Sequence, residues 1–275
     1  MRKVLYLIYG VVCYAVFFAT FCYAAGFLGN LLVPKSIDSP RTGPIEYAVL
    51  INLGLLTLFS IQHSVMARPA FKRWWTQYVP EPIERSTYVL LSSVCLALVF
   101  WLWQPIGGLV WNVTNPIARG VLYAIFAAGW IIILYTSFLI DHFDLFGLRQ
   151  VWLYFRGRPY THSGFKTPGA YRFVRHPLYV GWFLAFWATP VLTVAHVFFT
   201  LVTTAYILIA IQFEERDLVR EHSEYRQYQE QVPMLIPFTK MSTRQKLERI
   251  GAAAFLAFLL KGIVWLVVAG AVLAR

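Results

Sequence analysis

The stretch LYVGWFLAFWATPVLTVAHVFFTLVTTAYILIAIQF, residues 178–213, decides the fold of this chain. It contains no Lys, Arg, Asp or Glu. At about 1.5 Å per residue, one continuous helix of this length is far longer than the roughly 30 Å thickness of a bilayer core. Pro190 lies near the middle, and proline breaks or kinks a helix. We therefore expect a hairpin of two shorter helices, over residues 178–189 and about 193–213.

The composition of the 275 residues is that of a membrane protein. Hydrophobic residues make up 59% and charged residues 13%, whereas a soluble domain is nearer half apolar and a quarter charged. This composition excludes a disordered chain, and only three cysteines exclude a disulfide scaffold. Because the cysteines lie in apolar runs without Cys/His ligand spacing, we predict no metal site.

Further apolar runs reach the length of about 20 residues that a helix needs to cross a bilayer. They cover residues 4–33, 45–67, 86–104, 117–140 and 250–274. With the hairpin, these runs predict an all-α, polytopic transmembrane helical bundle. Its predicted parts are an N-terminal four-helix transmembrane region at 1–140, a core at 141–240 with the hairpin 177–213, and a C-terminal transmembrane helix at 241–275.

The net charge of +11 supports an orientation in the membrane. Nucleic acid binding is one use of such a surplus, but in membrane proteins Lys and Arg gather on the cytoplasmic side. Residues 67–85, 141–176 and 214–249 hold 17 of the 24 basic residues, whereas the alternate loops hold only Lys35 and Arg41. We therefore expect the three basic segments to face the cytoplasm. They do so only if the hairpin enters and returns on the same side.

The hairpin is preceded by the sequence GFKTPGAYRFVRHPLYVG, residues 164–181. Proline disfavours a helical conformation in the residue before it and is favoured at the first helical position, so His176 is predicted to be a helix N-cap. Tyr179 falls in the first turn, and Gly181 lets another backbone or a flat ligand approach closely. The alternative is an ordinary interfacial helix start with an anchoring Arg and Tyr.

Two adjacent carboxylates, Glu214 and Glu215, follow the apolar run at the other end of the hairpin. The hairpin is expected to return Glu214 to the level of His176, so that a carboxylate faces an imidazole beside cationic and aromatic residues. Such a site suits a zwitterionic ligand with a cationic centre. A solvated helix face is the alternative role for the two carboxylates.

Several motifs of this half resemble the isoprenylcysteine carboxyl methyltransferase and phospholipid methyltransferase superfamily. They are Gly169-Ala170-Tyr171, Arg175-His176-Pro177-Leu178-Tyr179-Val180-Gly181, Glu214-Glu215, and the segment from Tyr225 to Pro233. The resemblance covers roughly 160–238 and implies that the core at 141–240 binds S-adenosylmethionine. By this resemblance the cofactor-binding residues are Phe165, Lys166, Tyr171, His176, Pro177, Leu178, Tyr179 and Glu214. Unlike isoprenylcysteine members, the chain has no basic residue at 208–212, where those members meet their prenylcysteine substrate.

Three patches of the first half resemble a narrower family. They are QHSVMAR at 62–68, ERSTYVL at 84–90 and DHFDLFGLRQ at 141–150. Together with the second half they are similar to bacterial methanethiol S-methyltransferases, and the front portion resembles NnrU-like membrane proteins. The resemblance implies a bacterial enzyme that converts methanethiol to dimethyl sulfide. With the charge bias described above, we expect it in the inner membrane with its active site facing the cytoplasm. Its partners are then a small thiol and the lipid bilayer.

Methyl transfer to a thiol requires the thiolate, and a thiol is largely protonated at neutral pH. A neighbouring cation or base raises the thiolate fraction. We predict His142 and Asp144 as the thiol-activating pair, converging in a loop beyond Ile140, with His63 and Arg85 as supporting catalytic groups. The alternatives are a hydrogen bond between helices for His63, an ordinary positive-inside charge for Arg85 and a membrane boundary at His142.

Other functions are compatible with parts of the pattern. A methyltransferase for a lipid amine or another hydrophobic thiol would share the same cofactor half. A non-catalytic NnrU-like membrane factor would share the first half and bind no cofactor. A reductase is a further alternative, because sterol reductases have a distantly similar C-terminal half.

Overall fold

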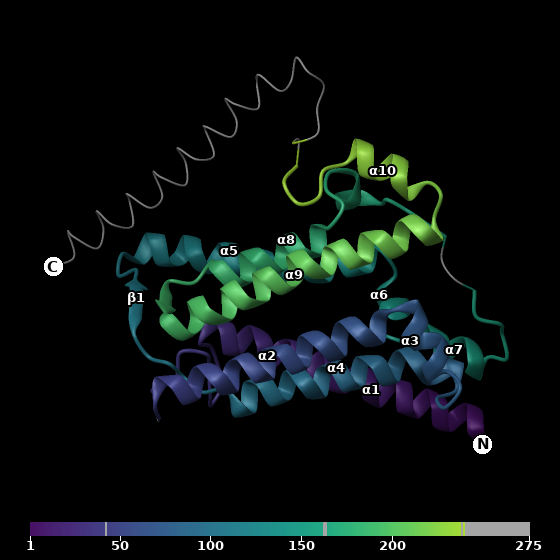
Figure 1. Cartoon of the computed structure of the whole chain (residues 1–275), viewed down its shortest axis with the longest axis horizontal. Coiled ribbons are helices and arrows are strands. Elements are labelled where there is room, and N and C mark those ends of the chain that lie inside the picture. Colours follow the sequence, from purple (N-terminus) through teal and green to yellow (C-terminus); the bar gives the residue numbers. More distant parts are fainter. Residues whose placement is uncertain (42, 162–163, 238, 240–275) are drawn as a thin grey trace, which may run out of the picture. The chain divides into compact units, whose positions relative to one another are not determined.

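The computed structural model describes residues 1–41, 43–161, 164–237 and 239, so the predicted last helix at 241–275 lies outside the described residues. The chain packs as two compact units, each built from separate stretches. Figure 1 labels the helices and strands of the chain. Unit 1 comprises Met1–Gly108, Ser137–Gly164 and Thr193–Ile211; unit 2 comprises Leu109–Thr136, Phe165–Leu192 and the described residues from Gln212 onward.

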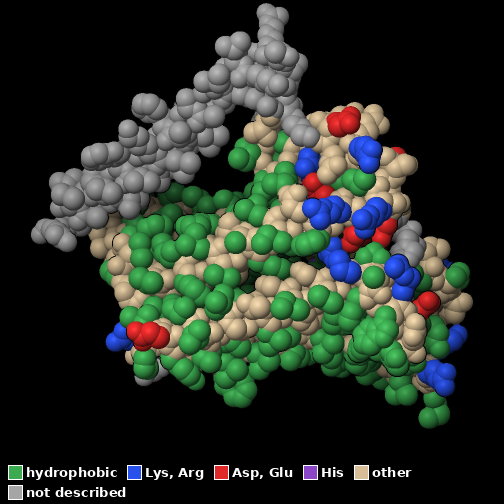
Figure 2. Space-filling view, in the orientation of Figure 1, with side chains coloured by type: hydrophobic (Ala, Val, Ile, Leu, Met, Phe, Trp, Pro, Cys, Tyr) green, Lys and Arg blue, Asp and Glu red, His purple; other side chains and the backbone are tan. Residues whose placement is uncertain are grey.

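Within the described ranges, five helices are long and apolar enough to cross a membrane. They are α1 (Arg2–Gly29), α2 (Ile45–Ala67), α4 (Glu81–Leu102), α5 (Pro116–Leu139) and α9 (Val194–Glu221). Helix α8 (Pro177–Trp187) is apolar but shorter. Hydrophobic side chains cover much of the visible helix surface (Figure 2), as lipid requires. The chain is therefore an integral membrane protein with the predicted polytopic helical bundle.

The end of α1 and the start of α4 differ from the predicted positions for local reasons. Helix α1 stops at Gly29, before the apolar run ends, because Asn30 adopts the left-handed conformation common after helices. Helix α4 begins ahead of Ser86, at Glu81, where a proline and acidic side chains in the first turn stabilise a helix N-terminus. The short helices α3 (Pro69–Trp75), α6 (His142–Leu145) and α7 (Leu148–Phe155) were not predicted.

In unit 1, α4 packs against both α1 and α2, and α7 packs against α1 and α4. Side-chain hydroxyls join these elements: Tyr9 of α1 hydrogen-bonds Thr87 at 3.0 Å. Ser86 of α4 donates to the carbonyl of Gly147 at 3.2 Å. These contacts hold together the helix ends that the sequence predicts to face the cytoplasm. The candidate residues of the first half lie at these ends.

The predicted hairpin consists of α8, which belongs to unit 2, and α9 (Val194–Glu221), whose residues up to Ile211 belong to unit 1 and whose residues from Gln212 belong to unit 2. The second helix is longer than predicted. Helix α8 begins at Pro177 with His176 as N-cap, as the sequence predicts. The break around Pro190 is an extended segment whose strand β2 (Val191–Thr193) pairs with β1 (Leu109–Asn112). Helix α9 continues past Phe213 to Glu221, because Glu, Arg and Leu are good helix formers even outside the apolar run.

Gly181 approaches another backbone, which was one of its two predicted roles. A Cβ atom on Gly181 would lie 2.8 Å from the carbonyl oxygen of Gly129 on α5 and 2.8 Å from the Ile133 side chain. A Cβ atom on Gly129 would likewise lie 2.7 Å from the Gly181 oxygen. The two glycines therefore set the close packing of α5 on α8, a common use of small residues between membrane helices.

We expect Gly181→Ala to lower the thermal stability of the detergent-solubilised protein, because the added methyl group overpacks the contact with α5, at a cost of about 1–3 kcal/mol. The matched control is Gly120→Ala, on the partner helix α5, where a Cβ atom meets nothing within 4 Å. There the gain in helix propensity makes the change neutral or slightly stabilising. Equal melting temperatures for the two variants would contradict this packing role.

Candidate functional site

The centre of unit 2 is a buried ion pair between Arg175 and Glu215. The Arg175 Nε donates to Glu215 Oε1 at 2.6 Å, and the second guanidinium contact reaches Glu215 Oε2 at 3.2 Å. Both side chains are buried, Glu215 with 7% of its surface exposed. A forked, charge-assisted contact of this kind fixes geometry as well as charge. It ties the residue before the helix N-cap of α8 to the outer part of α9.

His176 joins the same carboxylate. Its Nε2 lies 2.9 Å from Glu215 Oε1, and Gln229 Nε2 donates to Oε2 at 2.7 Å. The sequence places Glu214 opposite His176, but the imidazole contacts Glu215 instead. Adjacent residues on a helix point about 100° apart, and α9 presents Glu215, not Glu214, to this ring. His176 thus belongs to the buried clamp, which we define as Arg175, His176, Glu215 and Gln229.

The clamp also holds the segment after α10 (Tyr225–Gln231). The Arg175 side chain donates to the carbonyls of Gln229 and Val232. The backbone N–H of Arg175 bonds Pro233, and that of His176 bonds Met234, at 2.8 and 3.1 Å. The segment after α10 is therefore hydrogen-bonded to the two residues that precede α8. This contact places the 225–233 motif next to the start of the hairpin.

Glu214 has a separate partner. The Tyr179 hydroxyl donates to Glu214 Oε2 at 2.9 Å, and both side chains are half-buried. Burial, together with the charge of Glu214, raises the pKa of the Tyr171 phenol, so Tyr171 lies within the electrostatic reach of this carboxylate. Burial also raises the pKa of Tyr228 to about 12. Its protonated hydroxyl donates to the Tyr171 carbonyl at 2.5 Å. Three predicted cofactor residues, Tyr171, Tyr179 and Glu214, thus lie close together.

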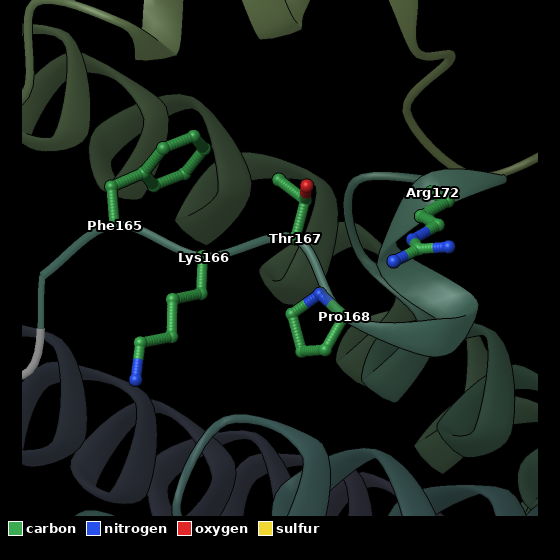
Figure 3. Close-up of a pocket in the computed structure, with 5 residues that line it drawn as sticks. All are labelled: Phe165, Lys166, Thr167, Pro168 and Arg172. Carbon is green, nitrogen blue, oxygen red and sulfur yellow. The ribbon is translucent and has the colours of Figure 1, made fainter.

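A pocket of about 380 Å³ lies on the segment that precedes Tyr171 and on the residue that follows it (Figure 3). Its lining consists of Phe165, Lys166, Thr167, Pro168 and Arg172. The first four follow one another on an extended strip, and Arg172 comes from the short helix η1 (Gly169–Arg172). The Phe165 ring packs against Tyr225 and Tyr228, with ring centroids 5.5 and 5.4 Å apart. The pocket therefore combines an anchored aromatic ring with two cationic side chains.

Pro177 and Leu178, the remaining predicted cofactor residues, form the first turn of α8. Pro177 is buried and Leu178 is half-buried. Pro177 supplies the fixed backbone angle that starts the helix directly after the clamp. The structure thus places all eight predicted cofactor residues in unit 2, and it brings Tyr171, Tyr179 and Glu214 together as one group and Phe165 with Lys166 as another.

His142, in unit 1, is enclosed by hydroxyls and aromatic rings. Its Nε2 lies 2.8 Å from the Tyr14 hydroxyl and its Nδ1 lies 2.8 Å from Ser137 Oγ. The Phe138 ring stacks on the imidazole at 4.2 Å, and only 2% of the residue is exposed. Burial lowers the pKa of His142 below its ordinary value, so the ring is neutral at pH 7. Any proton exchange with this ring passes through one of the two hydroxyls.

Asp144 lies in the same short helix but belongs to another network. Its carboxylate accepts hydrogen bonds from Arg149 at 3.2 Å, Gln150 at 3.1 Å and Tyr160 at 3.1 Å. His142 and Asp144 therefore do not form the predicted pair, because their side chains bind different partners. Asp141 turns the chain with a left-handed backbone, φ 84°, and starts α6, so the two side chains leave toward different partners.

His63 and Arg85 meet at a tyrosine that sequence reasoning missed. The Tyr88 hydroxyl lies 3.0 Å from His63 Nδ1 and 3.2 Å from Nε2, and Ser92 Oγ lies 3.2 Å from Nδ1. The Arg85 guanidinium carbon lies 5.8 Å from the centroid of the Tyr88 ring. Arg85, Tyr88 and Ser92 are spaced at i, i+3 and i+7, so they share one face of a helix. This spacing was the signal in the sequence that could have identified Tyr88.

Comparisons with known proteins identify the family of this chain. Residues 153–220 match the family described as "Isoprenylcysteine carboxyl methyltransferase (ICMT) family". The methanethiol S-methyltransferase of Crocosphaera subtropica is 57% identical over 239 residues, 86% of this chain and 94% of the relative. That of Mycobacterium tuberculosis is 50% identical over 244 residues, 88% and 100% of the two chains. Methanethiol S-methyltransferase 2 of Bradyrhizobium diazoefficiens is 53% identical over 232 residues, 84% and 89%. No solved structure matches this chain.

The apolar helices and the family match together define a membrane-embedded methyltransferase. Because relatives at 50–57% identity are matched over nearly their whole length, the chain belongs to the methanethiol S-methyltransferase family.

We expect Glu215→Ala to destabilise the protein by about 3–5 kcal/mol, since it leaves the buried Arg175 charge without its partner. Thermal unfolding in detergent measures this loss. Glu221→Ala, an exposed position on the same helix, removes the same charge and is expected to change stability by less than about 0.5 kcal/mol. A Glu215 variant as stable as the Glu221 variant would show that the clamp does not hold unit 2 together.

Proposed function

We propose that this protein transfers the methyl group of S-adenosylmethionine to methanethiol, which yields dimethyl sulfide and S-adenosylhomocysteine. The observation that carries the proposal is the similarity to proteins named methanethiol S-methyltransferase over most of this chain. The geometry of unit 2 supports the cofactor class, and the polar clusters of unit 1 supply groups for handling the proton of a thiol.

The residues of unit 2 fit S-adenosylmethionine by their chemistry. The pocket of about 380 Å³ falls in the usual range for small-molecule sites. Lys166 and Arg172 suit the carboxylate of the cofactor, and the anchored ring of Phe165 offers a flat partner for an aromatic base. Glu214 accepts one hydrogen bond from Tyr179, and a carboxylate accepts several, so it retains capacity for an ammonium group.

The other predicted cofactor residues act by position. His176 and Pro177 fix the start of α8 through the clamp, and Leu178 and Tyr179 form its first turn. Tyr171 lies near Glu214 and keeps its proton, because burial raises its pKa. The cofactor, when bound, supplies an electrophilic methyl group on a sulfonium. The chain's own task is to align that group with the acceptor and to exclude water, which accounts for much of the rate of such reactions.

For the acceptor, we propose that His142 takes up the thiol proton. Its neutral imidazole is a base near pH 7, and the hydroxyls of Tyr14 and Ser137 on its ring nitrogens provide the route for the proton. Asp144 is proposed to support this site by holding Arg149 and Tyr160, not by contacting His142. His63 and Arg85 are proposed to supply polar support through Tyr88.

We further propose that the protein resides in a bacterial inner membrane with the site facing the cytoplasm. The bias of basic residues to the segments 67–85, 141–176 and 214–249 supports this orientation. The cofactor-binding core is assigned to the predicted region 141–240, and within it to the described residues 165–192 and 212–237.

The direct test supplies the detergent-purified protein with methyl-labelled S-adenosylmethionine and methanethiol. We expect labelled dimethyl sulfide in the headspace, measured by gas chromatography. Labelled phospholipid in place of the volatile product would redirect the function to a lipid acceptor. Absence of both cofactor binding and product would refute the proposal.

Variants at the two sites separate cofactor binding from turnover. We expect Glu214→Gln to weaken binding of S-adenosylhomocysteine at least tenfold in calorimetry, because the substitution removes the charge that would face the ammonium group. His142→Gln is expected to keep that affinity and to lower kcat by about 10² or more, the usual contribution of a general base. Unchanged affinity in the first variant, or unchanged kcat in the second, would remove that residue from its proposed role.

A further inference from the structure

A second pocket of unit 2, of about 360 Å³, is bordered by three arginines. Arg216 and Arg220 come from α9 and Arg226 from α10, and all three are exposed. Gln212, Glu215, Val219 and Gln229 complete the lining. Figure 2 shows Lys and Arg side chains gathered over α10 and the adjoining end of α9. None of the three arginines belongs to the predicted cofactor site.

The charge of this pocket is strongly positive. Glu215, its acidic lining residue, is already bonded by Arg175, His176 and Gln229 on both carboxylate oxygens. The nearby acids of α9, Asp217 and Glu221, lie four residues apart on a different line of the helix and do not line the pocket. The pocket therefore offers guanidinium groups whose charge the lining does not neutralise.

The pocket begins where the apolar part of α9 ends, at the depth expected for lipid headgroups. The apolar part of α9 ends at Phe213, which is 47% exposed, one turn after Ile209, which is 57% exposed. At about 1.5 Å per residue, Arg216 lies roughly 4.5 Å and Arg220 roughly 10 Å beyond Phe213 along the axis. The headgroup layer on each side of a bilayer core is roughly 5–7 Å thick. The Arg216 guanidinium also lies 5.7 Å from the centroid of the Phe213 ring.

We propose that this arginine pocket binds the phosphate of an anionic phospholipid. Arginine matches phosphate with paired hydrogen bonds, and basic pockets at helix ends take up anionic headgroups. The exposed Phe213 and Ile209 accommodate the acyl chains, which is why a lipid fits the pocket better than a soluble phosphate does. The site lies outside the proposed methyl-transfer chemistry and stands on its own observations.

The test is native mass spectrometry of the full-length protein in uncharged detergent, titrated with phosphatidylglycerol or phosphatidylcholine. We expect one phosphatidylglycerol to be retained in preference to phosphatidylcholine. The double variant R216Q/R220Q is expected to weaken that binding at least tenfold, since it removes two of the three guanidinium groups that would meet the phosphate. Because both arginines are exposed, its melting temperature without lipid should equal that of the wild type.

The matched control is R156Q/R158Q, which removes two exposed arginines at the end of α7 in unit 1. It is expected to bind phosphatidylglycerol like the wild type. Equal losses in both double variants, or no loss in R216Q/R220Q, would overturn the site. If inorganic phosphate alone bound the protein as tightly as phosphatidylglycerol does, the lipid assignment would be wrong. None of these readings depends on methyl transfer, so they stand apart from the test of the proposed function.

Discussion

One buried carboxylate organises unit 2. Glu215 receives charge-assisted hydrogen bonds from Arg175 and His176 and a further one from Gln229. Through them it joins the start of α8, the outer part of α9 and the segment after α10. Burying a charge without partners is costly, whereas here each carboxylate oxygen is satisfied. Glu214 precedes Glu215 in the sequence, and Tyr179 lies in the first turn of the helix that His176 caps.

Much of the fold is predictable from the sequence because membrane helices follow the length of apolar runs. The starts of α2, α5 and α8 and the break near Pro190 agree with that reading. The side-chain partners are less predictable. Which of Glu214 and Glu215 faces His176 depends on the rotation of α9 about its axis, and the length of an apolar run does not determine that rotation.

For the candidate residues of the first half, too, the sequence predicts position but not partners. Their positions near helix ends follow from the sequence, but their partners come from elements far apart along the chain. Tyr14 reaches His142 across 128 positions, and Tyr88 reaches His63 across 25. Asp141 adds a left-handed turn that alters the direction of every side chain after it. A single sequence carries no signal for these long-range pairings. His142 and Asp144 therefore belong to two separate hydrogen-bond networks in the structure, and not to one pair as predicted.

The shortness of α8 has a consequence for how the protein is made. Its 11 residues span about 16 Å, roughly half of a bilayer core, so it does not cross the membrane as an independent segment. Beyond it, backbone groups that lipid would leave unbonded find partners: Val113 bonds the carbonyl of Pro190 and the Trp111 indole bonds that of Thr189. During biosynthesis, α8 therefore has to enter the bilayer together with the segments that complete it, which couples insertion of this region to its folding.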